Sequence, residues 1–261
     1  WTRIRVIIQH NIRKRFGQNF LVDNNIINKI LDLIEPRKHD HFIEIGPGMG
    51  ALTFPILDRI KNLDVIEIDR DLVNVLTEHN HTNQLSIHSA DALKFDFNSL
   101  CHPGQKLRLM GNLPYNISTP LLFHILNYSN IFHDLHIMVQ KEVGDRICSE
   151  PNNKTYGRLS VAIQARCKTT KLFDIKPNAF YPRPKVNSSM VQLIPYRPMS
   201  QQQEQQLDRV VQLAFSKRRK KIKNALDGLF KTEDLKLLAI DPENRPENLS
   251  VKDYINLSKI L

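Results

Sequence analysis

From residue 42 onward, short apolar runs alternate with segments in which apolar residues recur at helical spacing. The apolar runs predict seven strands, at residues 42–45, 65–68, 85–88, 107–110, 135–139, 171–175 and 189–194. Helical patterns fill most of the intervals up to residue 165, and strands that alternate with helices indicate a parallel sheet covered on both faces. The last two strands are joined by a Pro-rich loop, so we expect them to form an antiparallel pair at the sheet edge.

The chain changes character after Pro195 and Pro198. A polar stretch, SQQQEQQ at residues 200–206, begins a remainder that has only helical patterns. Apolar residues at helical spacing there predict a small packed helical domain, through Leu207, Val211, Ala214, Ile222, Ala225 and Leu229. We therefore expect an α/β domain over residues 1–198, of which 1–12 form an unassigned extension, and an all-helical domain over residues 199–261.

Composition is that of an ordinary folded protein, with 41% hydrophobic and 25% charged residues among 261. This excludes collagen-like and wholly disordered chains. Cys101, Cys148 and Cys167 lie far apart and form no C-x-x-C pair, so neither a disulfide framework nor a zinc knuckle is indicated. This cysteine usage fits a reducing compartment, and no apolar run approaches the length of about 18 residues that spans a membrane. We expect a cytoplasmic protein without a membrane segment.

The distribution of charge is more informative than its sum of +10. Residues 1–20 hold five basic residues and no acidic one, and the basic segment, residues 217–223 (KRRKKIK), holds six more. Two short patches thus carry the whole excess, which is typical of a protein that binds a polyanion. A solvated helix face that promotes solubility is the alternative. Within the basic segment, Arg218 takes the position on the apolar stripe between Ala214 and Ile222, where we expect it at the edge of the domain.

A glycine-rich string, EIGPGMGA at residues 44–51, follows the first predicted strand and opens a helix. Gly46 and Gly48 let the backbone pass close to a ligand, and the helix N-terminus presents unpaired N–H groups. With Ala51 in the third position, the string satisfies the G-x-G-x-x-G/A pattern of dinucleotide sites. The string alone does not separate a nicotinamide cofactor from S-adenosylmethionine, and it is also compatible with a structural turn.

Two carboxylates are expected at the same edge of the sheet as this loop. Glu67 ends the second strand, 21 residues after Gly46, where a carboxylate can accept both hydroxyls of an unphosphorylated ribose. Asp91 follows the third strand and could accept a hydrogen bond from an adenine amino group, although a turn or cap role is the simpler interpretation. His79 and His81 have no Cys or acidic partners at ligand spacing, so we expect no metal site.

The string GNLPYNIS at residues 111–118 follows the fourth strand and reaches the same edge. An adenine amino group is a poor nucleophile because its lone pair is delocalised into the ring. The side-chain oxygen of Asn112 and a backbone carbonyl could accept its two hydrogens and direct the lone pair at the methyl of a sulfonium. Pro114 stiffens the loop, and Tyr115 offers a face on which a base can stack. The string resembles the catalytic motif of methyltransferases that modify amino groups of nucleobases.

On these motifs the chain resembles the adenine dimethyltransferases of small-subunit ribosomal RNA (KsgA type) from Arg13 to the C-terminal helices. Residues 13–21 (RKRFGQNFL) and 178–188 (NAFYPRPKVNS) match two further motifs of that family. The resemblance implies a Rossmann-like methyltransferase domain that binds S-adenosylmethionine through Asn19, Leu21, Gly46, Gly48, Glu67, Ile68, Asp91, Ala92 and Asn112. It implies a catalytic group of Asn112, Leu113, Pro114, Tyr115 and Phe180, with Phe180 as a second stacking wall for the base.

The resemblance also implies a reaction and a partner. The substrate would be two adjacent adenines in the 3′-terminal hairpin loop of small-subunit (16S) ribosomal RNA, each receiving two N6 methyl groups. The protein would act as a monomer on precursors of the 30S subunit. Residues 215–220 resemble a segment associated with RNA contact, so we expect RNA to be bound by Arg13, Lys14, Arg15, Lys217, Arg218, Arg219, Lys220 and Lys223.

Three alternatives remain open at this point. The Erm-type enzymes, which methylate large-subunit RNA, are similar in the catalytic domain but more often carry Ile at the position of Leu113. A ribosome-assembly factor that acts mainly by binding would also use the two basic patches. A nicotinamide dehydrogenase is the weakest alternative, because it would have no use for the Asn-Leu-Pro-Tyr loop or the basic patches.

Overall fold

The computed structural model describes residues 18–80 and 84–261, which fall into two compact units. The first unit holds the described part of Trp1–Lys141 together with Lys171–Ile194. The second holds Glu142–Thr170 and Pro195–Leu261, so residues 142–170 group with the C-terminal segment. A domain boundary near residue 198 stays a prediction.

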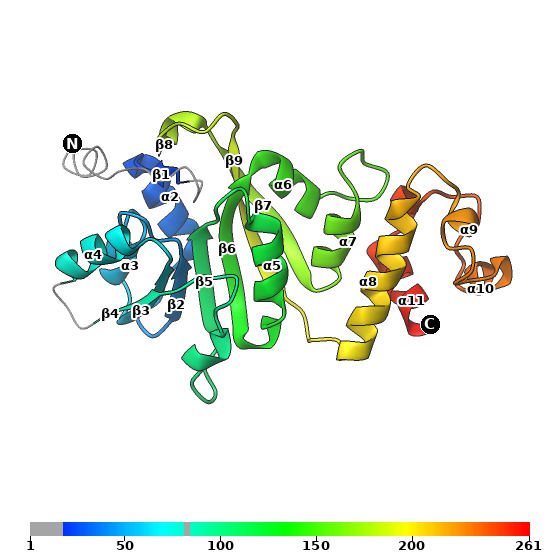
Figure 1. The fold of residues 1–261 in the computed structure, drawn as a ribbon, viewed down its shortest axis with the longest axis horizontal. Helices are drawn as coiled ribbons and strands as arrows, with labels where there is room; N and C mark the ends of the chain where they lie inside the picture. The colour runs from blue at the N-terminus through cyan, green and yellow to red at the C-terminus, as the bar shows by residue number, and fades with distance from the viewer. Residues whose placement is uncertain (1–17, 81–83) are drawn as a thin grey trace. The chain divides into compact units, whose positions relative to one another are not determined.

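Seven strands form one sheet in the order β4-β3-β2-β5-β6-β9-β7 (Figure 1). Their bounds are His41–Ile45 (β2), Asn62–Glu67 (β3), Leu85–Ser89 (β4), Leu107–Asn112 (β5), Phe132–Gln140 (β6), Cys167–Ile175 (β7) and Ser188–Pro195 (β9). The neighbours from β4 to β6 run parallel, and β9 runs antiparallel to β6. The predicted seven-stranded, mostly parallel sheet is therefore confirmed, with β9 and β7 as its last two strands at one edge.

The helices of the first unit are α2 (Asn24–Ile34), α3 (Thr53–Leu57), α4 (Arg70–His79) and α5 (Ser118–Leu126). Every residue of the internal strand β2 is buried, as expected for a strand of a parallel sheet that is covered on both faces. Crossover helices between parallel strands place the loops that follow β2, β3 and β5 at one edge of the sheet. That edge is where the glycine-rich string and the Asn-Leu-Pro-Tyr loop emerge.

Two elements of the first unit were not predicted. In α2, Ile27, Ile30, Leu31 and Ile34 are buried, and the Asp23 side chain caps the helix by accepting from two backbone N–H groups. A second small sheet pairs β1 (Phe20–Leu21) with β8 (Phe180–Tyr181) in antiparallel orientation. This pairing brings the described end of the string at residues 13–21 next to the string at residues 178–188, which is distant in the sequence.

The second unit contains mainly helices. It holds all of α6 (Lys141–Ile147) except its first residue. The other helices are α7 (Arg158–Gln164), α8 (Gln201–Ser216), α9 (Ile222–Ala225), α10 (Thr232–Leu237) and α11 (Val251–Lys259). Five residues of the predicted stripe are buried in its core, namely Leu207, Val211, Ala214, Ile222 and Ala225. The sixth, Leu229, is partly buried and packs against that core.

The basic segment does not lie on one helix, although the apolar stripe runs through it. Helix α8 ends at Ser216, and residues 217–221 form a turn before α9 begins at Ile222. Arg218 occupies the position at which the apolar stripe would continue. The neighbouring basic side chains also repel one another. The helix therefore loses both the apolar contact and the favourable charge pattern that would extend it.

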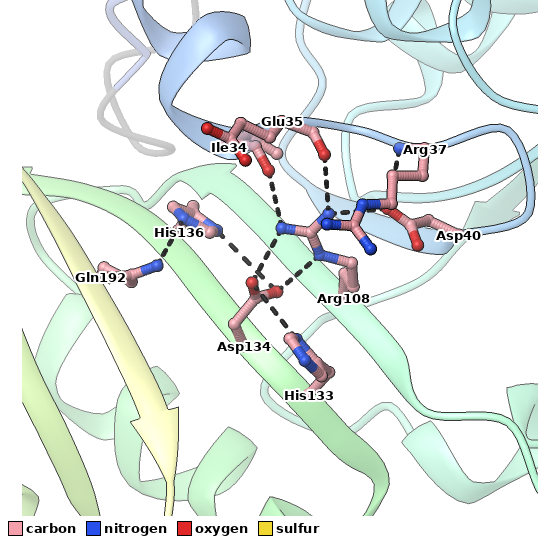
Figure 2. A network of polar contacts seen from close by, with 9 residues as sticks. All are labelled: Ile34, Glu35, Arg37, Asp40, Arg108, His133, Asp134, His136 and Gln192. Carbon is pink, nitrogen blue, oxygen red and sulfur yellow. Dashed lines mark hydrogen bonds and ion pairs between the residues drawn. The ribbon is translucent and has the colours of Figure 1, made fainter.

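A polar network centred on Arg108 joins α2 to the edge of the sheet where the parallel strands begin, opposite the edge that carries the glycine-rich string (Figure 2). The Arg108 guanidinium, near the start of β5, donates two hydrogen bonds of 2.8–2.9 Å to Asp134 on β6. It also donates at 2.7 Å to the Asp40 carboxylate and at 2.7 Å to the carbonyl oxygen of Ile34 at the end of α2. Beside it, burial lowers the pKa of His136 to about 4. The network is a structural anchor, because it lies at the other end of the strand that finishes at Asn112.

Among the described helices, none combines the length and the apolar character that crossing a membrane requires.

Candidate active site

A cavity of about 240 Å³ lies in the first unit, where β2, β3 and β5 end. All nine residues predicted to contact the cofactor line it, namely Asn19, Leu21, Gly46, Gly48, Glu67, Ile68, Asp91, Ala92 and Asn112. Leu113, Pro114 and Tyr115 also line it. Phe180, the remaining predicted catalytic residue, is 2% exposed within the hydrophobic core and is not among the lining residues.

The glycine-rich string forms one wall of the cavity. Gly46 and Gly48 have φ angles of 66° and 57°, in the left-handed region that side chains disfavour. A Cβ atom on Gly48 would also lie 2.9 Å from the ring of Phe20 in β1. The N-terminal strand therefore packs directly on the glycine loop, which neither string reveals on its own.

The Glu67 carboxylate is held at the end of β3 by two backbone N–H groups. The N–H of Asp69 donates to Oε1 at 2.9 Å, and the N–H of Gly48 donates to Oε2 at 3.3 Å. Burial raises the pKa of Glu67, whereas these hydrogen bonds favour its charged form. Because these two hydrogen bonds fix the carboxylate, it is preorganised to accept hydroxyl groups from a ligand in the cavity.

Sequence reasoning missed Glu44, which also lines the cavity and is 2% exposed. The Thr53 hydroxyl donates a hydrogen bond of 2.6 Å to Glu44 Oε2. Burial, with a smaller contribution from Glu67, raises the pKa of Glu44 to about 8 despite that hydrogen bond. The sequence did contain a signal for Glu44, because it is an acidic residue within the apolar strand 42–45. Burying a carboxyl group is costly unless a ligand or another polar group contacts it.

The other side of the cavity combines a carboxylate with apolar surface. Asp91 Oδ1 accepts from the Leu93 N–H at 3.0 Å, so Asp91 starts a turn, as the simpler interpretation held. No described residue donates to its second oxygen, which can therefore accept from a ligand. Ile68 is 46% exposed and offers an apolar face, beside the nearly buried Ala92. This combination suits a flat heteroaromatic ring with an amino group at its edge.

The Asn-Leu-Pro-Tyr loop begins at the last residue of β5. A Cβ atom on Gly111 would lie 2.6 Å from the Ile45 carbonyl oxygen, so only glycine lets β5 pass this close to β2. Asn112 Nδ2 donates at 2.8 Å to the carbonyl oxygen of Asn19, and no described residue donates to its Oδ1. The Leu113 N–H donates at 3.0 Å to Met138 on β6. These contacts leave Asn112 Oδ1 as an acceptor for a hydrogen-bond donor in the cavity.

The charges around the cavity distinguish between possible ligands. Its described lining includes the carboxyl groups of Glu44, Glu67 and Asp91 and no Lys, Arg or His side chain. Such a lining suits a cationic ligand, such as a sulfonium, better than the pyrophosphate of a dinucleotide.

The predicted RNA-binding residues differ in their surroundings. Arg13, Lys14 and Arg15 lie outside the described residues. In the second unit, Arg218 Nε lies 2.6 Å from Glu247 Oε2, and Lys223 forms an ion pair with Glu243. Within the described part of the chain, no ion pair involves the three other predicted residues, Lys217, Arg219 and Lys220.

The predicted absence of a metal site stays a prediction. His79 Nδ1 lies 2.8 Å from the Val75 carbonyl oxygen, and His81 is outside the described residues. Over residues 18–80 and 84–261, no group of three or more His, Cys, Asp or Glu side chains is arranged to hold a metal ion.

Comparisons with known proteins agree with this geometry. A family model described as "Ribosomal RNA adenine dimethylase" matches residues 9–261. The chain is 48% identical over 253 residues to ribosomal RNA small subunit methyltransferase A of Nitrosococcus oceani, which covers 96% of each chain. It is 46% identical over 255 residues to the protein of the same name from Dechloromonas aromatica, covering 97% of this chain and 98% of that one.

Two solved structures share the fold. A dimethyladenosine transferase from Plasmodium falciparum superposes with a TM-score of 0.81 at 26% identity, covering 91% of this chain and 95% of that chain. The 23S rRNA methyltransferase ErmE superposes with a TM-score of 0.74 at 20% identity, covering 92% and 98%. The second likeness concerns the fold alone.

Proposed function

The chain belongs to the ribosomal RNA adenine dimethylase family, and from this premise we propose that it dimethylates N6 of two adjacent adenines in small-subunit (16S) ribosomal RNA. The methyl donor is S-adenosylmethionine, and the target adenines lie in the loop of the 3′-terminal hairpin. The protein acts as a monomer on precursors of the 30S subunit in the bacterial cytoplasm. The name shared by its bacterial relatives, small subunit methyltransferase A, supports the choice of subunit.

One observation carries this proposal. Asn112 and Tyr115, which suit a nucleobase amino group, line the same cavity as Glu67 and Asp91, which suit a nucleoside. A methyl donor and an adenine can therefore meet in one site, as the direct transfer of a methyl group requires.

The residues on the glycine-loop side fit the cofactor. S-adenosylmethionine, when bound, supplies an electrophilic methyl group on a sulfonium. Glu67 would accept the ribose hydroxyls, and Asp91 the adenine amino group, with Ile68 and Ala92 against the adenine ring. Glu67 would place negative charge beside a cationic ligand, whereas burial keeps a proton on Glu44.

The residues of the Asn-Leu-Pro-Tyr loop fit the target adenine. Asn112 Oδ1 would accept one hydrogen of the amino group, which helps the nitrogen lone pair to point at the methyl donor. Tyr115 would stack on the base, a contact worth about 1–3 kcal/mol. A strong general base is unnecessary, because the nitrogen becomes acidic once it is methylated. Phe180 would act as a second wall only if its ring reached the cavity, so that role stays a prediction.

The choice of a hairpin loop follows from the energetics of presenting a base. Loop adenines are partly unstacked, so they enter a pocket at a lower cost than a base inside a duplex. Lys217, Arg219 and Lys220 would contribute salt-dependent attraction to the phosphates around that loop.

The decisive experiment measures transfer of labelled methyl groups from S-adenosylmethionine to unmethylated small subunits and, in parallel, to large-subunit RNA. Nucleoside mass spectrometry of each sample identifies the product. We expect N6,N6-dimethyladenosine in the small-subunit sample alone. Label in large-subunit RNA alone would establish the Erm-type reaction instead, and binding without transfer to either RNA would favour an assembly role.

A further inference from the structure

The Tyr115 ring, which lines the cavity, is attached to the protein at its far end. Tyr115 Oη and Ser188 Oγ share a hydrogen bond of 2.6 Å. Tyr115 belongs to the loop after β5, whereas Ser188 is the first residue of β9 and ends the second string, residues 178–188. The bond therefore connects the string at residues 111–118 to the string at residues 178–188, through two residues that are 73 positions apart in the sequence.

Ser188 is a fixed anchor. It is fully buried at 0% exposure and pairs with Gln140 in the antiparallel ladder between β6 and β9. Next to this pair, the Lys141 N–H donates at 2.8 Å to the Asn187 carbonyl oxygen. The Ser188 hydroxyl is consequently held by the central sheet and not by a loop.

The position of this hydroxyl determines which motion of Tyr115 it restrains. The phenolic oxygen lies on the axis about which the ring rotates at χ2, so a bond to it leaves that rotation open. It does fix the direction of the whole side chain, which χ1 determines. Burial raises the pKa of Tyr115, so the phenol keeps its proton and the bond persists at neutral pH. A restrained ring offers a stacking surface that is already in place when a base enters.

We propose that Ser188 is a positioning residue for methyl transfer, which acts by holding Tyr115 where the target base stacks. The inference rests on the proposed function, because it assumes that Tyr115 contacts the target adenine. Ser188 itself touches neither the cofactor nor the base. Its contribution is preorganisation, which affects the rate of the reaction more than the binding of RNA.

The adjacent serine provides a matched control. Ser189 is also 0% exposed, but its side chain points to the other face of the sheet, where its hydroxyl donates to Asp174 Oδ1 at 2.6 Å. Ser188→Ala and Ser189→Ala therefore delete the same atom at adjacent buried positions, and only the first deletion releases Tyr115. Tyr115→Phe removes the same bond from the other side while it retains the ring.

The test measures kcat and KM of the whole protein on unmethylated small subunits, with the melting temperature and cofactor affinity of each variant. We expect Ser188→Ala and Tyr115→Phe each to lower kcat about three- to tenfold, the usual effect of one hydrogen bond, with KM for RNA within about twofold. The double variant should be no slower than either single variant, because both remove one bond. Ser189→Ala should leave kcat unchanged.

The inference is overturned if Ser188→Ala matches Ser189→Ala in kcat, or if the losses in the double variant multiply. It is also overturned if the decrease in kcat of both Ser188→Ala and Tyr115→Phe is accompanied by a matching decrease in melting temperature or in cofactor affinity. Failure of the proposed function would look different, because the unaltered protein would then transfer no methyl group to the small subunit.

Discussion

The side-chain amide of Asn112 donates a hydrogen bond of 2.8 Å to the backbone carbonyl oxygen of Asn19. These residues are 93 positions apart in the sequence, at the end of β5 and immediately before β1. This bond holds the amide nitrogen at Asn19, and no described residue donates to the amide oxygen, which can therefore accept a hydrogen bond in the cavity. The N-terminal string therefore determines which hydrogen-bonding atom the Asn-Leu-Pro-Tyr loop presents.

Replacing Asn112 by alanine should abolish methyl transfer while leaving cofactor binding largely intact. Asn112→Ala removes the proposed acceptor for the adenine amino group, whereas Glu67 and Asp91, the proposed cofactor contacts in the same cavity, remain in place. We expect a loss of at least about a hundredfold in kcat, as for other preorganised polar groups that act on the reacting atoms. Initial rates and calorimetric titration with S-adenosylmethionine check the two parts separately. Undiminished turnover would exclude the role of Asn112.

The sequence predicted which residues surround the cavity better than it predicted how they are held. Loops that follow parallel strands share one edge, so the strand pattern was enough to bring Gly46, Glu67, Asp91 and Asn112 together. The contact between Asn112 and Asn19 depends on the pairing of β1 with β8, two-residue strands too short to give a periodic signal. Such contacts follow from tertiary packing and have no local pattern.

Glu44 should make the stability of the protein decrease as pH rises. Its pKa is about 8 in the folded protein against a usual value of 4.5, so between these values the folded state retains a proton that the unfolded state has lost. The free energy of unfolding then falls with increasing pH, by up to about 1.4 kcal/mol per pH unit across this window. Glu44→Gln cannot titrate but retains an oxygen that accepts from Thr53, so its stability should depend less on pH.

Urea denaturation of both proteins between pH 5 and pH 8 tests this expectation, with Glu78→Gln as the control. Glu78 is an exposed residue of α4, and its replacement should not change the slope. If the curves of Glu44→Gln and the unaltered protein run parallel over the window, Glu44 is ionised in the folded state and its inferred protonation is wrong.

Arg108 should matter for stability and not for cofactor binding. Its side chain is 12% exposed and pairs with Asp134 and Asp40, so Arg108→Met removes the guanidinium from a buried carboxylate, Asp134, and from the half-buried Asp40. Breaking a buried pair in this way costs about 3–5 kcal/mol of unfolding free energy. Arg59→Ala is the matched control, because the Arg59–Asp32 pair spans 3.5 Å at side-chain exposures of 40% and 71%. We expect that control to cost less than about 1 kcal/mol.

Urea denaturation checks the stability of both variants, and titration with the cofactor checks the site. The affinity should change little in Arg108→Met at temperatures where it is folded, since Arg108 lies at the opposite end of β5 from Asn112. Equal losses of stability in the two variants would show that the buried network contributes no more than a surface pair.

The number of basic residues in the basic segment does not show which of them form ion pairs within the protein. Its six charges are apparent in the sequence, but their partners come from residues 20 or more positions away: Arg218 pairs with Glu247, and Lys221 and Lys223 pair with Glu243. Arg218 Nη2 also donates at 2.9 Å to the Lys154 carbonyl oxygen. Arg218 thus has an internal structural role, which its position on the apolar stripe anticipated in part.

Lys220 and Arg218 should therefore affect RNA binding in different ways. Lys220 forms no ion pair with any described residue, so Lys220→Ala should weaken RNA binding and reduce the slope of log K against log salt by about one. Arg218→Ala releases Glu247 and the Lys154 carbonyl, so it should lower the melting temperature, with a smaller change in that slope. Binding to small-subunit RNA measured from about 50 to about 200 mM salt separates the two effects. A reduction of the slope by Arg218→Ala that equals that of Lys220→Ala, with an unchanged melting temperature, would mean that Arg218 exchanges Glu247 for a phosphate when RNA binds.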